Sequence, residues 1–189
     1  MAEDTACNYP GIKDCGEISL IKRIFSTYNN RIQVEVETIR VNGKNLEYVR
    51  VVQPDFVVVL AILKKRILVE KQYRYGIRKY VYELPAGYIE TGERPIETAR
   101  RELAEETGYY PSKIKLMFET YQAPARISSM MHFYLAEGLI KREKHLDDAE
   151  VLEEKFVSES EFESMIKDNS IKDQATIAAY YYYKIHFEK

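Results

Sequence analysis

Apolar and polar positions along the chain predict a mixed β-sheet flanked by helices. Ile32, Val34 and Val36 alternate with polar residues, a period of two that is typical of a half-buried strand. The continuous apolar run 56–63 instead predicts a strand that is buried on both faces. Between them, the turn sequence Asn-Gly-Lys-Asn at 42–45 predicts a hairpin.

The remaining elements follow from apolar positions that repeat every two residues in strands and about every 3.6 residues in helices. Further strands are expected at 66–73, 80–84, 113–121, 129–139 and 151–157, and helices at 95–107, 159–167 and 173–186. A mixed sheet with helices on both sides is an α/β sandwich, and the strands of residues 17–52 add an antiparallel N-terminal extension. Residues 1–16 are expected to form a loose leader.

Composition limits the classes of protein. The 189 residues suffice for one domain with a good core, and neither the net charge of −2 nor the pI near 6.0 fits a nucleic-acid-binding surface. The chain has no run of 18 apolar residues and no signal-peptide pattern, so we expect a cytoplasmic protein with no membrane partner. Cys7 and Cys15 are too few for a zinc site. A pair of free thiols is expected, with a disulfide across the leader as the alternative.

The segment 87–109 carries the candidate chemistry, on one helix. Pro95 suits the first turn of that helix, and Gly108 suits the position just past its end. Because Arg94 is a poor N-cap, we expect the incoming loop, rather than a side chain, to fix the start of the helix. The residues expected to face the core are Ile96, Ala99 and Leu103.

The charges on this helix separate into two groups. Glu97, Arg101 and Glu105 form a ladder of alternating sign at spacings of four, which is typical of a solvated helix face. Glu102 and Glu106 are also four residues apart but carry like charge, with no Lys or Arg three or four residues away. Such a pair is mildly destabilising unless a cation lies between its members, and hard carboxylate oxygens favour Mg²⁺ or Mn²⁺. Glu105 is a third candidate ligand, although its place in the ladder competes with that role.

The spacing of these residues resembles the Nudix box, Gly-x5-Glu-x7-Arg-Glu-U-x-Glu-Glu-x-Gly-U, where U is a bulky aliphatic residue. Only Tyr109 departs from it. Flanking segments resemble the ADP-ribose pyrophosphatase branch of the Nudix hydrolases over roughly residues 30–185. They are Lys71-Gln72-Tyr73-Arg74, Glu83-Leu84-Pro85-Ala86-Gly87, Pro124 fifteen residues beyond Tyr109, and Ile171-Lys172-Asp173-Gln174-Ala175-Thr176. The resemblance implies a Nudix-like α/β/α sandwich, with residues 53–189 as the hydrolase domain and residues 17–52 as a dimerisation element.

What the resemblance implies chemically is hydrolysis of a nucleoside diphosphate, most simply ADP-ribose to AMP and ribose 5-phosphate, by a homodimer. Alternatives are another nucleotide substrate, such as a nucleotide sugar, NADH or a dinucleoside polyphosphate, or a non-catalytic module that senses ADP-ribose. The implied metal ligands for Mg²⁺, or for Mn²⁺ as a substitute, are the Ala86 carbonyl, Glu102, Glu105 and Glu106. The implied substrate contacts are Arg74, Glu83, Pro124 and Arg126. The alternative for Arg74 and Glu83 is an ordinary ion pair between strands. The alternative for Arg126 is a solvated side chain that contacts no substrate.

The general base is an open question in this chain. Many relatives carry a carboxylate in the loop that follows the box, whereas residues 123–129 contain none. We hypothesise that Glu105 is the base and that Arg101 orients it. The alternatives are Glu102, the acidic residues Asp147, Asp148, Glu150 and Glu153, or the metals alone. His132 is expected to be a packed residue rather than a ligand.

Overall fold

The computed structural model describes residues 15–27, 31–142 and 152–187. Residues 1–14 of the expected leader, including Cys7, therefore lie outside the described residues. Strand β1 begins at Cys15, within the expected leader. Asp147, Asp148 and Glu150 of the acidic loop lie outside them as well. By the clustering of its contacts the chain divides into two compact units, Met1–Pro54 with Tyr121–Ser129, and Asp55–Thr120 with Met130–Lys189.

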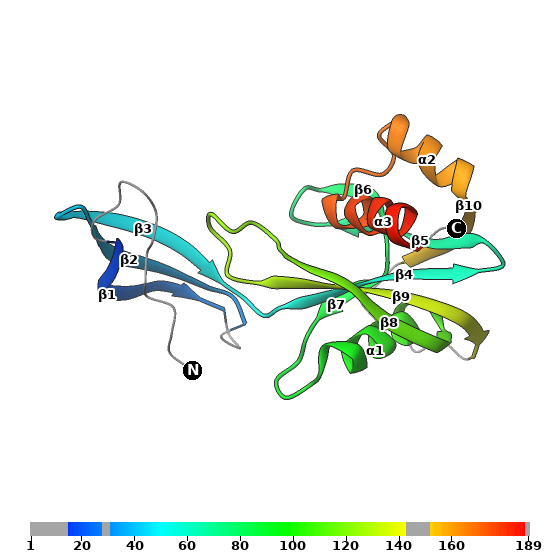
Figure 1. Cartoon of the computed structure of the whole chain (residues 1–189), viewed down its shortest axis with the longest axis horizontal. Coiled ribbons are helices and arrows are strands. Elements are labelled where there is room, and N and C mark those ends of the chain that lie inside the picture. Colours follow the sequence, from blue (N-terminus) through cyan, green and yellow to red (C-terminus); the bar gives the residue numbers. More distant parts are fainter. Residues whose placement is uncertain (1–14, 28–30, 143–151, 188–189) are drawn as a thin grey trace. The chain divides into compact units, whose positions relative to one another are not determined.

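The first unit is built on a three-stranded antiparallel sheet in the order β1-β2-β3 (Figure 1). Its strands are β1 (Cys15–Ser26), β2 (Gln33–Val41) and β3 (Lys44–Val52). Asn42 and Gly43 join β2 to β3 with φ angles of 50° and 74°, which is the left-handed backbone that a two-residue hairpin requires. The predicted hairpin is confirmed.

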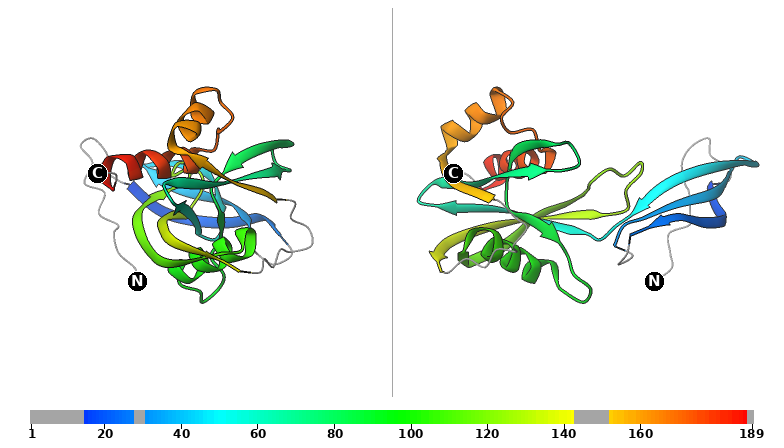
Figure 2. Two further views of the ribbon diagram at one scale, coloured as in Figure 1. Left: turned by 90° about the vertical axis from the view of Figure 1, so that its right-hand side faces the viewer. Right: turned by 180° about the vertical axis from the view of Figure 1, so that it is seen from behind.

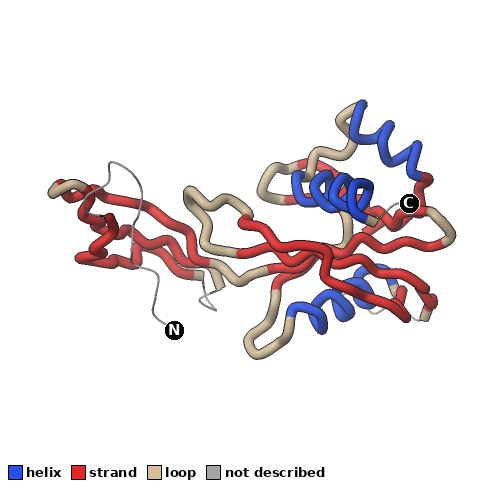
Figure 3. The backbone as a smooth tube through the Cα atoms, in the orientation of Figure 1, coloured by secondary structure: helices blue, strands red, loops and turns tan. Residues whose placement is uncertain are grey.

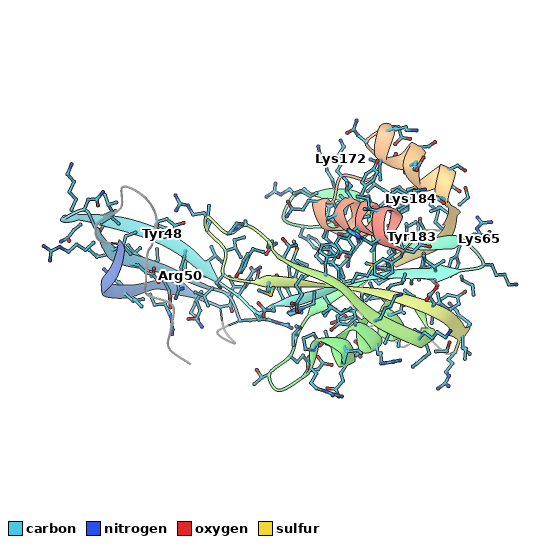
Figure 4. All side chains as sticks on the ribbon, viewed as in Figure 1. Tyr48, Arg50, Lys65, Lys172, Tyr183 and Lys184 are labelled. Carbon is cyan, nitrogen blue, oxygen red and sulfur yellow. The ribbon has the colours of Figure 1, made fainter. Side chains whose placement is uncertain are left out.

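Segment Tyr121–Ser129 belongs to this unit because it bonds to the end of β3. The N–H of Val51 donates to the Arg126 carbonyl at 2.7 Å, and the N–H of Ser128 donates to the Val51 carbonyl at 3.1 Å. Side chains add to the contact, since the Tyr48 hydroxyl donates to the Ala125 carbonyl and the Arg126 guanidinium lies 4.6 Å from the Tyr48 ring centroid. Figure 4 labels Tyr48 and its strand neighbour Arg50.

The second unit contains a seven-stranded mixed sheet in the order β10-β5-β4-β9-β8, with β6 paired to β5 and β7 paired to β4. Its strands are β4 (Phe56–Leu63), β5 (Arg66–Arg74), β6 (Lys79–Glu83), β7 (Ala86–Tyr88), β8 (Tyr109–Tyr121), β9 (Met130–Lys141) and β10 (Leu152–Ser158). β4 and β9 run parallel, while β5 is antiparallel to β4, β6 and β10. β8 begins four residues earlier than its polar sequence predicts.

Strand β4 divides the core of this unit in two, because alternate side chains point to opposite faces of a sheet. Val58 and Leu60 join the cluster that also contains residues of α2 (Glu159–Lys167) and α3 (Gln174–His186). Val57, Val59 and Ala61 join the cluster that contains residues of α1 (Pro95–Thr107). Figures 1 and 2 show α1 on one side of the sheet and α2 with α3 on the other, and Figure 3 separates the layers by colour. The predicted α/β sandwich is confirmed.

Helix α3 carries four consecutive tyrosines that differ in exposure. Tyr180 is fully buried, and its hydroxyl donates to Glu163 at 2.9 Å and to Glu159 at 3.2 Å, whereas Tyr181 is exposed. The Tyr182 ring stacks on Phe118 with 4.2 Å between centroids. Within the described residues, no helix combines the length and the apolar composition needed to cross a membrane.

Candidate active site

The ends of α1 determine where its glutamates lie. At the C-terminal end, Gly108 has φ 68° and its N–H donates to the Ala104 carbonyl at 2.8 Å, the left-handed cap that the sequence predicts. At the N-terminal end Arg94 makes no capping hydrogen bond with its side chain, as expected, but Glu97 in the first turn adds a contact that the sequence did not predict. The Glu97 carboxylate accepts the N–H of Arg94 at 3.2 Å and the Arg94 Nε–H at 2.9 Å. Glu97 therefore completes the first turn instead of a ladder with Arg101.

Arg101 ties the loop before α1 to the helix. Its guanidinium donates to both oxygens of Glu93 at 3.0 Å and to the Tyr88 carbonyl at 3.3 Å. It also donates to Glu105 at 3.0 Å and to its chain neighbour Glu102 at 2.8 Å. The hydrogen bond from Arg101 lowers the pKa of Glu93 to about 2. Spacing along the helix did not predict the contact with Glu102, because side chains of adjacent residues do not normally face each other.

Glu102 lies directly against the backbone of Gly87. A Cβ atom built on Gly87 would stand 1.9 Å from Cδ of Glu102, far inside van der Waals contact. Gly87 does not have a positive φ, so the position requires glycine for space and not for backbone conformation. The Glu102 carboxylate of α1 is therefore packed against strand β7.

Glu106 lies against the preceding residue, Ala86. It is 5% exposed, and its Oε2 accepts the N–H of Ala86 at 3.1 Å. Successive Cα atoms are only about 3.8 Å apart. Glu102 and Glu106 therefore contact two adjacent residues of the same segment, Gly87 and Ala86.

The three candidate ligands on α1 differ in orientation. Glu105 is half exposed and turns toward Arg101, while Glu102 and Glu106 turn toward β7. Within the described residues, no three acidic, imidazole or thiol groups gather into a complete metal cage. The donor set nevertheless fits a hard divalent cation, because two carboxylates one helical turn apart supply only oxygen atoms.

Arg74 and Glu83 form an ion pair between β5 and β6, with 2.6 Å between Nε and Oε1. Burial raises the pKa of Glu83 more than the hydrogen bond from Arg74 lowers it. Burial opposes the charge of Arg74, but the hydrogen bond to Glu83 and the fields of Glu83 and Glu106 outweigh it and raise the pKa of Arg74. The influence of Glu106 indicates that this pair lies near the glutamates of α1.

The other predicted residues take different positions. Pro124 and Arg126 lie on segment Tyr121–Ser129 of the first unit, where Arg126 stacks over Tyr48. Glu153 is largely exposed and lies 3.4 Å from Lys71 Nζ. His132 is buried, as predicted, with Nδ1 2.6 Å from Glu119 and Nε2 3.8 Å from Asp55.

Sequence reasoning missed one contact of the site. The Thr176 hydroxyl accepts the N–H of Leu84 at 3.0 Å, two residues before Ala86. The only signal was the resemblance of segment 171–176 to the closing helix of the branch, which says nothing of this contact.

Comparisons with known proteins identify the family of the chain. A model of the NUDIX domain matches residues 52–180, so the chain belongs to the Nudix family. It is 32% identical over 158 residues to an ADP-ribose pyrophosphatase of Bacillus subtilis (strain 168), covering 82% of this chain and 85% of the relative. The chain is accordingly a Nudix hydrolase similar to the ADP-ribose pyrophosphatases, that is, a diphosphate hydrolase.

Two further similarities extend the comparison. A methanol dehydrogenase activator of Bacillus methanolicus is also 32% identical, over 167 residues that cover 87% of this chain and 90% of the relative. A crystal structure of an ADP compounds hydrolase superimposes with a TM-score of 0.83 at 20% identity, covering 94% of this chain and 96% of that one. The structural match supports the fold.

Gly87→Ala should separate folding from activity. The new methyl group would displace the Glu102 carboxylate, which is the flexible end of a side chain, so the fold should persist. We expect the rate of diphosphate hydrolysis to fall about 100-fold, because misplacement of a site group by about 1 Å has that effect. Gly76→Ala is the control, since no atom lies within 4 Å of its Cβ position. Equal rates for the two variants would contradict the role of Gly87.

Glu93 should make stability depend on pH in the acid range. Its pKa is about 2 in the folded protein and about 4.5 in the unfolded chain. A carboxylate with a lowered pKa stabilises the fold above its unfolded pKa, and that contribution is lost as the pH falls through the folded pKa. The Tm of the natural chain should exceed that of Glu93→Gln at pH 5, and the difference should shrink toward pH 2. A difference in Tm that stays constant over this range would contradict the pairing with Arg101.

Proposed function

We propose that the protein hydrolyses the diphosphate of ADP-ribose to AMP and ribose 5-phosphate, using Mg²⁺ or, as a substitute, Mn²⁺. The observation that carries this proposal is the pair Glu102 and Glu106, held against adjacent residues of β7. The similarity to an ADP-ribose pyrophosphatase over most of both chains supports the choice of substrate.

The reaction cleaves one P–O–P bond with water. The water oxygen bonds to one phosphorus, the bridging oxygen leaves with the other phosphate, and two phosphomonoesters result. When bound, a divalent cation would neutralise part of the diphosphate charge and make water more acidic. Glu102 and Glu106 would hold it, with Glu105 and the Ala86 carbonyl as further ligands.

Arg74 and Glu83 would place the substrate near these carboxylates. A guanidinium can donate two parallel hydrogen bonds to a phosphate group, and the bond to Glu83 already restricts the orientation of Arg74. Pro124 and Arg126 are proposed as further substrate contacts on the basis of the family resemblance.

Glu105 is the proposed general base. It is half exposed, so water can reach it, and the hydrogen bond from Arg101 holds its carboxylate at 3.0 Å. Arg101 would act by orienting Glu105 and Glu102. A base must contact the attacking water directly or through one other water, and Glu105 adjoins the proposed cation ligand Glu106.

A homodimer is proposed on the basis of the family resemblance and of the outer strands β1 and β3 of the N-terminal sheet. Ile24, Phe25, Leu46 and Val49 on these strands are between 44% and 55% exposed. Strand edges invite pairing between chains.

A substrate panel tests the activity. ADP-ribose, a nucleotide sugar, NADH and a dinucleoside polyphosphate are incubated with the protein and Mg²⁺, and the products are separated by chromatography. We expect AMP and ribose 5-phosphate from ADP-ribose, at a rate at least about tenfold above the others. A preference of tenfold corresponds to about 1.4 kcal/mol of transition-state binding.

The same assay distinguishes the alternatives. Equal rates on all four compounds would remove the case for ADP-ribose, and tight binding of ADP-ribose without AMP release would indicate a sensing module. Both Glu105→Gln and Glu106→Gln should abolish turnover. Near-normal turnover of Glu105→Gln alone would show that Glu105 is not the base.

The dimer is tested by light scattering after size-exclusion chromatography. We expect twice the chain mass of 22.2 kDa for the natural protein and a monomer for Phe25→Glu, because a charge would be buried in an apolar interface. Leu116→Glu changes a similarly exposed residue of β8 and should stay dimeric. A natural chain that elutes as a monomer at tens of micromolar would contradict the proposal.

A further inference from the structure

Helix α3 contacts the segment 84–86, which lies beside Glu102 and Glu106, through one buried hydroxyl group. Thr176 lies in the first turn of α3 and is fully buried, and its Oγ1 accepts the N–H of Leu84 at 3.0 Å. Leu84 is itself 1% exposed, so this N–H has no access to water. The N-cap residue Asp173 accepts the N–H of Thr176 at 2.7 Å and so fixes the turn that carries the hydroxyl.

The segment Leu84, Pro85 and Ala86 is held at three successive backbone groups by three different elements. Thr176 of α3 binds the N–H of Leu84. The N–H of Val59 in β4 donates to the Pro85 carbonyl at 2.8 Å. Glu106 of α1 accepts the N–H of Ala86 at 3.1 Å. A shift at any one of these points moves the other two, because the peptide units between them are planar and short.

Gly87 follows this segment directly and lies against Glu102. The position of the segment therefore affects where both carboxylates of α1 lie. Of the three anchors, Val59 contributes a backbone group and Glu106 is a proposed cation ligand. Only Thr176 holds the segment with a side chain that is free of any proposed contact with metal or substrate.

We propose that Thr176 is a positioning residue for the divalent-cation site, acting through Leu84 and Ala86. This inference rests on the proposed function, because it requires that Glu102 and Glu106 bind a cation. Removing the hydroxyl leaves the buried N–H of Leu84 without an acceptor, which favours displacement of the segment. The displaced segment no longer holds Glu106 and Glu102 at their spacing, and cation affinity falls.

A purely structural role predicts something different. Thr176→Val has nearly the same shape as threonine and keeps the packing, so a structural role would lower the Tm and leave cation affinity unchanged. Thr176→Ser keeps the hydroxyl and removes only a methyl group. Tyr180→Phe is the matched control, because Tyr180 lies on the same helix, is equally buried and loses a hydroxyl that bonds Glu159 and Glu163.

The experiment measures Mn²⁺ binding without substrate, from the electron paramagnetic resonance signal of free Mn²⁺, at a temperature where every variant is folded by circular dichroism. We expect Thr176→Val to weaken Mn²⁺ binding about tenfold, as loss of outer hydrogen bonds around metal sites does. Thr176→Ser should stay within about threefold of the natural chain, and Tyr180→Phe should bind Mn²⁺ unchanged. Should Thr176→Val fail to fold, Thr176→Ala takes its place.

Three outcomes would overturn the inference while leaving the proposed function intact: unchanged affinity in Thr176→Val, no rescue in Thr176→Ser, or an equal loss in Tyr180→Phe. Absence of Mn²⁺ binding by the natural chain would overturn the cation site of the proposed function and this inference with it. The two failures are therefore distinguishable.

Discussion

The contact of two glutamates of one helix with two adjacent residues of one strand is the interaction on which the proposed site depends. Glu102 lies against Gly87 and Glu106 accepts the N–H of Ala86, so both carboxylates contact the first two residues of β7. Like charges four positions apart on one helix repel each other, and Glu106 is also buried. In the proposed site a divalent cation would relieve both costs, and it would also neutralise part of the charge of a diphosphate substrate.

The rest of the second unit holds that contact in place. The alternating side chains of β4 pack against α1 on one face and against α2 and α3 on the other, so α1 and α3 are fixed relative to the same strand. Arg101 then anchors the loop before α1 through Glu93, and Thr176 anchors the segment before β7 through Leu84. In the proposed site the two carboxylates are thus held from both sides of the sheet, which would offset the repulsion between them.

Features set by local sequence were the ones that could be predicted. The apolar run of β4 and the helix α2 have the bounds that the sequence pattern predicts, because burial on both faces and an amphipathic period of 3.6 leave clear signals. The helical spacing of Glu102 and Glu106 likewise predicts that the two carboxylates share one face of α1. The glycine of the box was recognised from its spacing, whereas the reason for it, the space occupied by Glu102, is visible only in the fold.

Features set by three-dimensional neighbours could not be predicted. Glu97 caps α1 instead of pairing with Arg101, because Arg94 offers a nearer cation. Arg101 bonds Glu102 because the loop residue Glu93 holds the guanidinium in place, which helix spacing does not encode. Thr176 contacts Leu84 across 92 positions of the chain, and no local pattern indicates a partner at that distance.

Crystals soaked in MnCl₂ and measured for anomalous scattering test the central claim most directly. The proposed site predicts an anomalous peak within about 2.2 Å of carboxylate oxygens of both Glu102 and Glu106, next to Ala86. A Mn²⁺ peak elsewhere in the molecule, with none between these two carboxylates, would contradict it.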